Sequence, residues 1–451
     1  MLRPTLLFLS LMSLVPLSGC NSNAKINEVS AAASAEPDSS IAGAKPSETP
    51  SAKRSSSQLV ASRPAAAGPI ELSKDGILAA ALSQEELAEG WVRLFDGQSL
   101  FGWFAAGDAD WQVVDGTIRV TKGERSYLCT SFQMPEYELK LEFRSDEKTN
   151  SGIFLRTGPQ PEDVAKKSLE LNIAPRDNPF PTGSFVQRKK LESKDLDDKL
   201  GQAFDPTEWH TYQVRVSDRK VAVSLDGKPV MELKDFEADA SGHISLQHNE
   251  GRVEFRNILL RPIGRQELKV DEDWNADWTT AQKPGSNFKV TAVEDGLKIQ
   301  GGLGQVQSKF DFGDFFLQAC YSLKKPEVNS GIFFRCIRDN MLDGYECQVN
   351  HAVLNGDPLS PADSGAGAIF RRAKARIVVG DGTDHDHISV LANGAHIVTW
   401  VNGVQVTDFT DTRQLDENPR RGLRLKAGPI SLQGHDPESE VIYHQLQISP
   451  F

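Results

Sequence analysis

The sequence lacks the residue patterns that mark structural zinc sites, nucleotide binding and Ser-His-Asp catalysis. Its five cysteines include no Cys-x-x-Cys pair and no histidine at zinc-ligand spacing, so no structural metal is indicated. No nucleotide-binding glycine-rich loop, Ser-His-Asp order or His-Glu-x-x-His helix occurs. The 50 basic residues are outnumbered by 62 acidic ones, and no basic patch suited to phosphates stands out. Nucleic acid is therefore not an expected partner, and a neutral or polar small molecule fits better.

The apolar run at the N-terminus, from Leu6 to Val15, is too short to span a bilayer as a stable helix. It ends in small residues, so residues 1–20 are expected to be a cleaved export signal. Leu17-Ser-Gly-Cys20 resembles the bacterial lipobox, which implies lipid attachment at Cys20; the alternative is an ordinary secretory signal. We expect an exported protein, anchored by lipid to a membrane on the outer-membrane or periplasmic side.

Residues 21–84 are expected to form a disordered tether. Most of this stretch consists of Ala, Ser, Pro, Glu and Lys, and it cannot bury enough apolar area to offset the entropy lost on ordering. At its end, Ser83-Gln-Glu-Glu86 matches a capping box ahead of Leu87, which predicts a short helix leading into the first folded domain.

A seven-residue stretch occurs twice, as Asn150-Ser-Gly-Ile-Phe-Leu-Arg156 and as Asn329-Ser-Gly-Ile-Phe-Phe-Arg335. Six of the seven positions agree across a spacing of 179 residues, which indicates a tandem duplication. Asn-Ser-Gly reads as a turn and the following residues as a strand that ends near the arginine. The arginine is either functional or a side chain whose stem packs on apolar surface.

Both halves are rich in strand signals. Residues 137–144 alternate apolar and charged side chains, the period of a sheet with one buried face. Asp226-Gly227 predicts a hairpin turn in the first half, and Asn393-Gly394 and Asn402-Gly403 predict two in the second. Many short strands and few helices predict an all-β protein of sandwich or jelly-roll type.

A series of motifs resembles the 3-keto-disaccharide hydrolase domain family. The first half carries Gly90-Trp-Val-Arg-Leu-Phe-Asp-Gly97, Trp111-Gln-Val-Val-Asp-Gly116, Asn150-Ser-Gly152 and Val253-Glu-Phe-Arg-Asn-Ile258 in order, and the second carries Gly344-Tyr-Glu-Cys-Gln-Val349. The resemblance implies a concanavalin-like jelly roll for each copy of the repeat, at residues 85–264 and, more divergent, at 268–451; together with the lipobox we expect a bacterial lipoprotein. It also implies a carbohydrate-active protein that cleaves 3-keto-glycosides, by hydrolysis or by C1–C2 elimination followed by hydration.

Chemistry at a 3-keto sugar needs a base for the C2 proton, a partner for the developing oxyanion and an acid for the leaving oxygen. Because strand side chains alternate, a glutamate and an amide two residues later share a face. We expect one sheet face to present the candidate residues in each half, and which half is catalytic stays open. The catalytic candidates are Glu170 and Glu346 as base or metal ligand, Arg156 and Arg335 as partners of the oxyanion, and His248 and His435 as acid or base. The substrate-binding candidates are Arg144, Asn150 and Asn172 in the first half and Asn329, Tyr345 and Gln348 in the second.

Other interpretations of these residues remain. A glutamate on an exposed strand face is usually only solvated, and an arginine opposite it usually forms a weak surface pair. Asp384-His-Asp-His387 looks like a metal cluster, but alternation divides its histidines and aspartates between two faces. A divalent metal ion is a candidate cofactor and a sugar the expected partner. The rival functions are a non-catalytic carbohydrate-binding protein and a structural or adhesion module.

Overall fold

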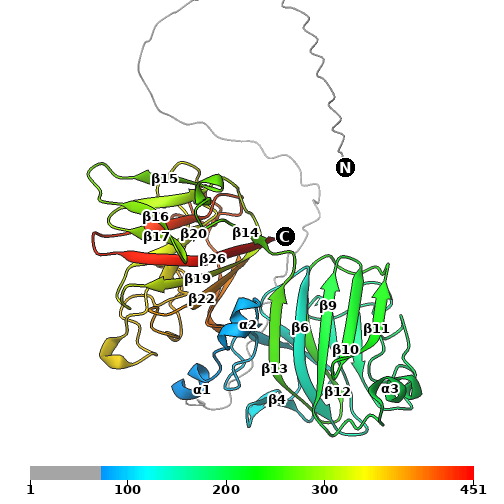
Figure 1. Ribbon diagram of the computed structural model, residues 1–451. Helices are drawn as coiled ribbons and strands as arrows, with labels where there is room; N and C mark the ends of the chain where they lie inside the picture. The colour runs from blue at the N-terminus through cyan, green and yellow to red at the C-terminus, as the bar shows by residue number, and fades with distance from the viewer. Residues whose placement is uncertain (1–72) are drawn as a thin grey trace, which may run out of the picture. The chain divides into compact units, whose positions relative to one another are not determined.

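The computed structural model describes residues 73–451, which fold into two tandem antiparallel β-sandwiches (Figure 1). Each sandwich pairs an eight-stranded sheet with a five-stranded sheet. The all-β prediction with two jelly-roll domains is confirmed. The expected export signal, Cys20 and the tether up to residue 72 lie outside the described residues. Over residues 73–451, no helix is long and apolar enough to cross a membrane.

In the first sandwich the two sheets face each other across one core. The eight-stranded sheet runs β11 (Lys228–Lys234), β10 (Lys220–Leu225), β9 (His210–Ser217), β6 (Tyr137–Ser145), β13 (Val253–Pro262), β4 (Thr117–Val120) and β3 (Gln112–Val114), with β1 (Val92–Arg93) beside β13. The five-stranded sheet runs β2 (Trp103–Ala106), β5 (Ser126–Thr130), β12 (His243–Glu250), β7 (Asn150–Thr157) and β8 (Leu169–Ile173), and α3 (Ser193–Leu200) lies in the connection from β8 to β9.

The second sandwich repeats this topology. Its eight-stranded sheet runs β16 (Lys289–Val293), β17 (Gly296–Gln300), β26 (Glu440–Pro450), β19 (Phe315–Leu323), β22 (Asp386–Asn393), β23 (His396–Val401) and β24 (Val404–Thr410), with β14 (Gln266–Glu267) beside β26. The five-stranded sheet runs β15 (Trp278–Gln282), β18 (Gly304–Ser308), β25 (Ser431–Gly434), β20 (Ser330–Phe334) and β21 (Tyr345–Val349); the short helices are η1 (Trp274–Ala276) and η2 (Leu354–Gly356).

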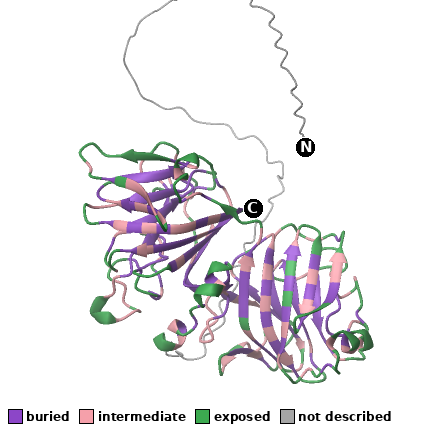
Figure 2. Cartoon of the chain, viewed as in Figure 1, coloured by how far each residue is buried: buried purple, intermediate pink, exposed green. Residues whose placement is uncertain are grey.

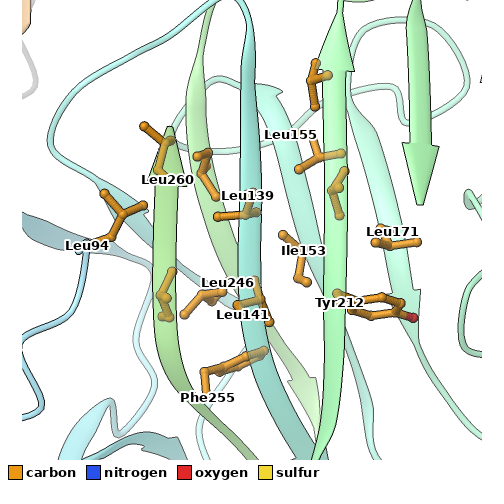
Figure 3. Close-up of a cluster of buried hydrophobic side chains, with 14 of the residues drawn as sticks. Leu94, Leu139, Leu141, Ile153, Leu155, Leu171, Tyr212, Leu246, Phe255 and Leu260 are labelled. Carbon is orange, nitrogen blue, oxygen red and sulfur yellow. The ribbon is translucent and has the colours of Figure 1, made fainter. Parts of the chain in front are cut away.

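The alternation of side chains along the strands builds the cores. Along β6, buried and half-buried residues alternate from Tyr137 to Ser145, and Figure 2 shows the same banding on neighbouring strands. The leucines of β6 point between the sheets toward Ile153 and Leu155 of β7 (Figure 3). Burying such apolar side chains between two sheets is the main source of stability in a sandwich.

The end of the predicted tether is ordered. Lys74–Leu78 form α1, whose Ile77 is buried in the core cluster of the second sandwich, and Leu82 is also buried. The predicted capping box at Ser83 and Glu86 is present and begins α2 (Gln84–Ala88). Residues 74–84 are ordered and do not belong to the tether, because the apolar side chains at positions 77, 80 and 82 are stabilised by burial.

The two sandwiches are in contact. The core cluster of the first includes Phe316, Leu391, Val398 and Trp400 from the second. The Trp400 indole donates to the backbone oxygen of Arg93 at 3.1 Å. The described residues 73–451 accordingly belong to a single compact unit, in keeping with the short connection between the repeats.

The repeated arginine ends its strand in a way that the sequence does not show. Arg156 and Arg335 adopt positive φ angles of 49° and 47°, which turn the chain out of the sheet. Arg156 donates to the backbone oxygen of Asp218, in the β9–β10 turn of the facing sheet, at 2.6 Å. Arg335 donates to Gly394 in the equivalent β22–β23 turn, also at 2.6 Å.

These two arginines therefore connect the sheets of each sandwich and are not aimed at the outward face that bears the glutamates. Arg335 is fully buried, and its guanidinium also contacts the backbone oxygens of Gly313 and Arg424 and the Asp314 carboxylate. The predicted oxyanion role for Arg156 and Arg335 is therefore wrong. Their charge is used to satisfy buried carbonyl groups.

Replacing Arg335 with alanine should lower the free energy of unfolding by about 3 kcal/mol, because several buried acceptors would lose their donor. Chemical denaturation followed by fluorescence would measure this change. The matched control is Arg338→Ala, which removes an ion pair to Asp311 from a side chain that is 39% exposed and should cost less than about 1 kcal/mol. Equal costs for the two variants would contradict the bridging role.

Candidate functional site on the five-stranded sheets

The two candidate glutamates lie on edge strands, on the face that points away from the core. Glu346 alternates along β21 with Tyr345, Cys347 and Val349, which are all core residues. Glu170 alternates in the same way along β8 with Leu169, Leu171 and Ile173. Asn172 and Gln348 follow two residues later and share the outward face, as alternation predicts.

The glycine of each repeated Asn-Ser-Gly motif makes room for the glutamate beside it. Gly331 of β20 lies opposite Gln348 in the sheet register, and a Cβ there would be 3.1 Å from the Glu346 Oε1 atom. Gly152 has the same relation to Glu170, at 3.3 Å. Both distances are tight for a Cβ contact. Because the glycine of the repeated motif has no side chain, the glutamate carboxylate can lie directly against the neighbouring strand.

Both carboxylates are buried enough to favour the protonated form. Burial raises the pKa of Glu346 to about 7, against an opposing effect of the Arg420 charge. Burial likewise raises the pKa of Glu170 to about 7, opposed by a hydrogen bond from Gln247 and the charge of Arg125. Each of these two residues is only 7% exposed. A carboxylate with a pKa near neutrality can gain and release a proton at physiological pH.

Arg420 is the functional candidate that the sequence did not reveal. Its Nη2 lies 3.4 Å from the Glu346 Oε2 atom, and its guanidinium lies over the ring of Phe333. Two of its nitrogens also donate to the backbone oxygen of Leu342 at 3.0 and 3.1 Å, which fixes the side chain. A pocket beside it is lined by Glu346, Phe370, Arg371, Arg372 and Arg420.

Arg420 comes from a connection that has no full counterpart in the first sandwich. Residues 411–430 join β24 to β25, whereas residues 235–242 make the equivalent connection from β11 to β12. The only sequence signal was the basic pair in Pro419-Arg-Arg-Gly422. The second sandwich therefore places a cation against its glutamate by means of a longer loop.

The two candidate histidines lie on opposite faces of their strands. Gln247 pairs with Gly152 and faces outward, so His248, the next residue, faces the other side. In the second sandwich Gly434 separates Gln433 from His435, which returns His435 to the outward face. Its Nε2 lies 3.3 Å from the Asn329 Nδ2 atom, and the Asn329 Oδ1 atom accepts from Gln348 at 2.9 Å. The structure therefore brings His435 into the group of Gln348 and does not bring His248 to Glu170.

Two of the predicted substrate-binding residues lie elsewhere. Arg144 is on β6 of the eight-stranded sheet, where it forms an ion pair with Glu254 and lies over the ring of Trp209. Tyr345 faces the core, and its hydroxyl donates to Asp411 at 2.7 Å. Both assignments are wrong because the residues lie on another sheet or on the other face of the strand. Asn150 stands at the start of β7 opposite Glu250, in the position of Asn329.

The outward faces carry amide oxygens with no hydrogen-bond partner. Within residues 73–451, such buried atoms include Oε1 of Gln348 and Gln433 in the second sandwich. In the first they include Oε1 of Gln247 and Oδ1 of Asn172. A buried acceptor without a partner is costly, and the hydroxyl groups of a sugar would satisfy these four.

Asp384-His-Asp-His387 does not converge on one point. The Asp386 carboxylate turns inward and accepts from Asn402 at 2.6 Å, whereas His385 and His387 share the outer face, as alternation predicts. Burial lowers the pKa of His387 to about 4. In the described part of the chain, one group of three potential metal ligands is close together: Asp295, His385 and His444, on the eight-stranded sheet.

Comparison with known proteins identifies the family. The profile described as 3-keto-alpha-glucoside-1,2-lyase-like domain matches residues 90–261 and again residues 269–449. No curated protein matches the chain.

Solved structures with similar folds include a candidate glycosyl hydrolase from Parabacteroides distasonis, at 21% identity and a TM-score of 0.35, over 41% of this chain and 99% of that one. The carbohydrate-binding module CBM66 from Bacillus subtilis has 12% identity and a TM-score of 0.27, over 36% of this chain and 95% of that one. A lichenase from a mouse hindgut metagenome has 13% identity and a TM-score of 0.29, over 42% and 98%.

The family profile covers most of the chain, in two adjacent copies that coincide with the two sandwiches. The chain is a carbohydrate-active protein and belongs to the 3-keto-alpha-glucoside-1,2-lyase-like domain family.

Proposed function

We propose that the second sandwich cleaves 3-keto-glycosides by eliminating the substituent at C1. The observation that carries this proposal is the outward-facing Glu346, with a pKa of about 7, against the guanidinium of Arg420. The family description names a 1,2-lyase activity toward a 3-keto-alpha-glucoside, which supports elimination as the first step. A base and a cation at one point are what such a reaction needs.

The first step is removal of the proton on C2. The C3 ketone acidifies this proton, because the electron pair left on C2 delocalises to the ketone oxygen. Glu346 in its ionised form takes the proton, and Arg420 stabilises the charge that develops on the oxygen. Since Arg420 is already held by the backbone oxygen of Leu342, little reorganisation is needed when that charge appears.

The second step is departure of the C1 substituent. The enolate electrons re-form the ketone, a double bond forms between C1 and C2, and the C1–O bond breaks. The leaving oxygen needs a proton, and His435 is the candidate donor because it lies in the same outward group and its side chain is 40% exposed. Addition of water to the unsaturated sugar then gives the product of net hydrolysis.

The first sandwich has a different role in this proposal. Glu170 has the same raised pKa, but no described cation forms an ion pair with it as Arg420 does with Glu346, since the charge of Arg125 acts from farther away. Its outward face also lacks the exposed histidine. It retains the open amide oxygens of Gln247 and Asn172 beside the ring of Phe154, which pairs with Glu170. Hydrogen-bond acceptors next to an aromatic ring suit a sugar. We propose that this sandwich binds carbohydrate without turning it over.

The location of this activity is also a proposal. The lipobox-like Leu17-Ser-Gly-Cys20 supports export, removal of residues 1–19 and a lipid anchor on Cys20. The protein would then act on the outer-membrane or periplasmic side, where a low-charge substrate reaches it by diffusion.

A purely sugar-binding protein is the second candidate function. The unpartnered amide oxygens occur on both five-stranded sheets, and binding alone would satisfy them. The two functions are distinguished by turnover: a binding protein would show saturable affinity for a 3-keto-glucoside and release no aglycone.

Replacing Glu346 with glutamine should reduce kcat on a 3-keto-glucoside by about 1,000-fold, because the amide cannot accept the C2 proton. Aglycone release followed by mass spectrometry would measure this, together with appearance of the unsaturated or hydrated 3-keto sugar. The matched control is Glu170→Gln, which should leave kcat within a few-fold of the wild type. Loss of turnover in the Glu170 variant alone would assign catalysis to the first sandwich.

The pH profile should follow the ionisation of Glu346. Because the base must be deprotonated, kcat/KM should rise with pH through about 7 and level off above it. A profile of initial rates from pH 5 to pH 9 with one 3-keto-glucoside would show this limb. A base with an ordinary carboxyl pKa would instead give a rise near pH 4 to 5, which would contradict the assignment.

Replacing Arg420 with alanine should lower kcat by about 100-fold, because one charged partner of the oxyanion is lost. The control is Arg421→Ala. Arg421 is the neighbouring residue, is 68% exposed and pairs with Asp416, so its loss should leave turnover unchanged. Equal effects of the two substitutions would show that the loop acts through general charge and not through contact with the substrate.

A further inference from the structure

We infer that the second sandwich holds a divalent transition-metal ion of the zinc class on its eight-stranded sheet, with Asp295, His385 and His444 as ligands. One atom from each residue lies within 4.8 Å of the others. Asp295 is in the β16–β17 turn, His385 precedes β22, and His444 is on β26. None of these residues belongs to the proposed catalytic group, which lies on the other sheet.

The distances between the candidate ligand atoms suit a tetrahedral site. The Asp295 Oδ2 atom lies 3.1 Å from the His385 Nε2 atom and 3.0 Å from the His444 Nδ1 atom. Zinc bonds of about 2.0–2.1 Å at tetrahedral angles place neighbouring ligand atoms about 3.3 Å apart. The remaining pair, the His385 Nε2 and His444 Nδ1 atoms, lies within 4.8 Å, and the two rings are stacked with their centroids 4.1 Å apart. The half-exposed His385 ring therefore has to rotate for both lone pairs to reach one ion.

His444 is oriented by a second contact. Its Nε2 lies 2.9 Å from the Ser322 hydroxyl, and its Nδ1 donates to the backbone oxygen of Asp295 at 2.6 Å. A ligating histidine is commonly fixed by a hydrogen bond at its other ring nitrogen. Binding of the ion through Nδ1 requires the other tautomer of the neutral ring: Nδ1 loses its proton and coordinates through its lone pair, and Nε2 carries a proton that it donates to the Ser322 hydroxyl.

The site can be reached from solvent. The side chains of Asp295 and His385 are 70% and 47% exposed, whereas that of His444 is 9% exposed. A hollow of about 410 Å³ adjoins His385 and is also lined by Cys320, His387 and Gln445. Three protein ligands with an open side leave coordination positions for water. Two imidazoles and one carboxylate favour zinc and its neighbours over calcium or magnesium.

The first sandwich uses the same place differently. Its β13 pairs with β6 as β26 pairs with β19, and Phe255 and Tyr443 occupy equivalent positions. Arg256 and Arg144 therefore stand where His444 and Ser322 stand in the second sandwich. There Arg256 forms an ion pair with Glu142, and both arginines lie over the ring of Trp209. The histidine cluster is thus a feature of the second copy alone.

The test is zinc titration of the full chain, purified without a polyhistidine tag and treated with chelator. Calorimetry should show one zinc ion per chain, and cobalt in its place should give the visible absorption of a four-coordinate ion. Asp295→Asn and His385→Ala should each weaken binding by about 100-fold or more, since loss of even a supporting contact costs 10- to 100-fold. Both positions are exposed, so folding is expected to survive the substitutions.

Two controls separate this site from other sources of binding. His396→Ala removes a histidine of the same sheet whose one acidic neighbour is Asp408, at 2.7 Å, and should leave the titration unchanged. Glu346→Gln should also retain the ion. Absence of stoichiometric binding, binding that survives Asp295→Asn, or loss of the ion in the Glu346 variant would each overturn the inference.

Discussion

The alternation of side chains along β21 is the constraint on which the candidate site depends. The same five residues place Tyr345, Cys347 and Val349 in the core and Glu346 and Gln348 on the outward face. A shift of one residue in register would bury the carboxylate and expose the core residues, so packing energy fixes the position of the base. The glycine on β20 then lets the strand lie close beneath that carboxylate, and burial brings its pKa to the range useful for proton transfer.

The duplication separates what the fold needs from what the proposed chemistry needs. Both copies retain the glycine beside the glutamate. Both also retain the arginine that has a positive φ angle and hydrogen-bonds to the facing sheet. They differ in the connection that precedes β12 in the first copy and β25 in the second, which is longer in the second copy and carries Arg420 there. The eight-stranded sheet also differs: it carries an arginine and tryptophan cluster in the first copy and a histidine cluster in the second. Divergence is thus concentrated in loops and outward faces, where substitutions leave the core intact.

Much of the fold and part of the site could be predicted from the sequence. The repeated motif, the alternating patterns and the hairpin turns were sufficient for two sandwiches, and alternation placed Glu346 with Gln348 and Glu170 with Asn172. The roles of Arg156 and Arg335 could not be predicted, because nothing in the sequence shows that a residue other than glycine adopts a positive φ angle at the end of the strand. Arg420 was missed because it lies in a connection without periodicity. The grouping of Asp295 with His385 and His444 depends on three distant segments meeting on one sheet.

One feature of β12 and β25 concerns how duplicated domains separate in evolution. After the shared Leu-Gln pair, the first copy continues with His248, and the second inserts Gly434 before His435. Because strand residues alternate, this single position decides whether the imidazole faces solvent or the interior, whereas the leucine remains in the core of either copy. The gain or loss of one codon at the end of a strand can therefore move a histidine from the interior to the outward face without a change of fold.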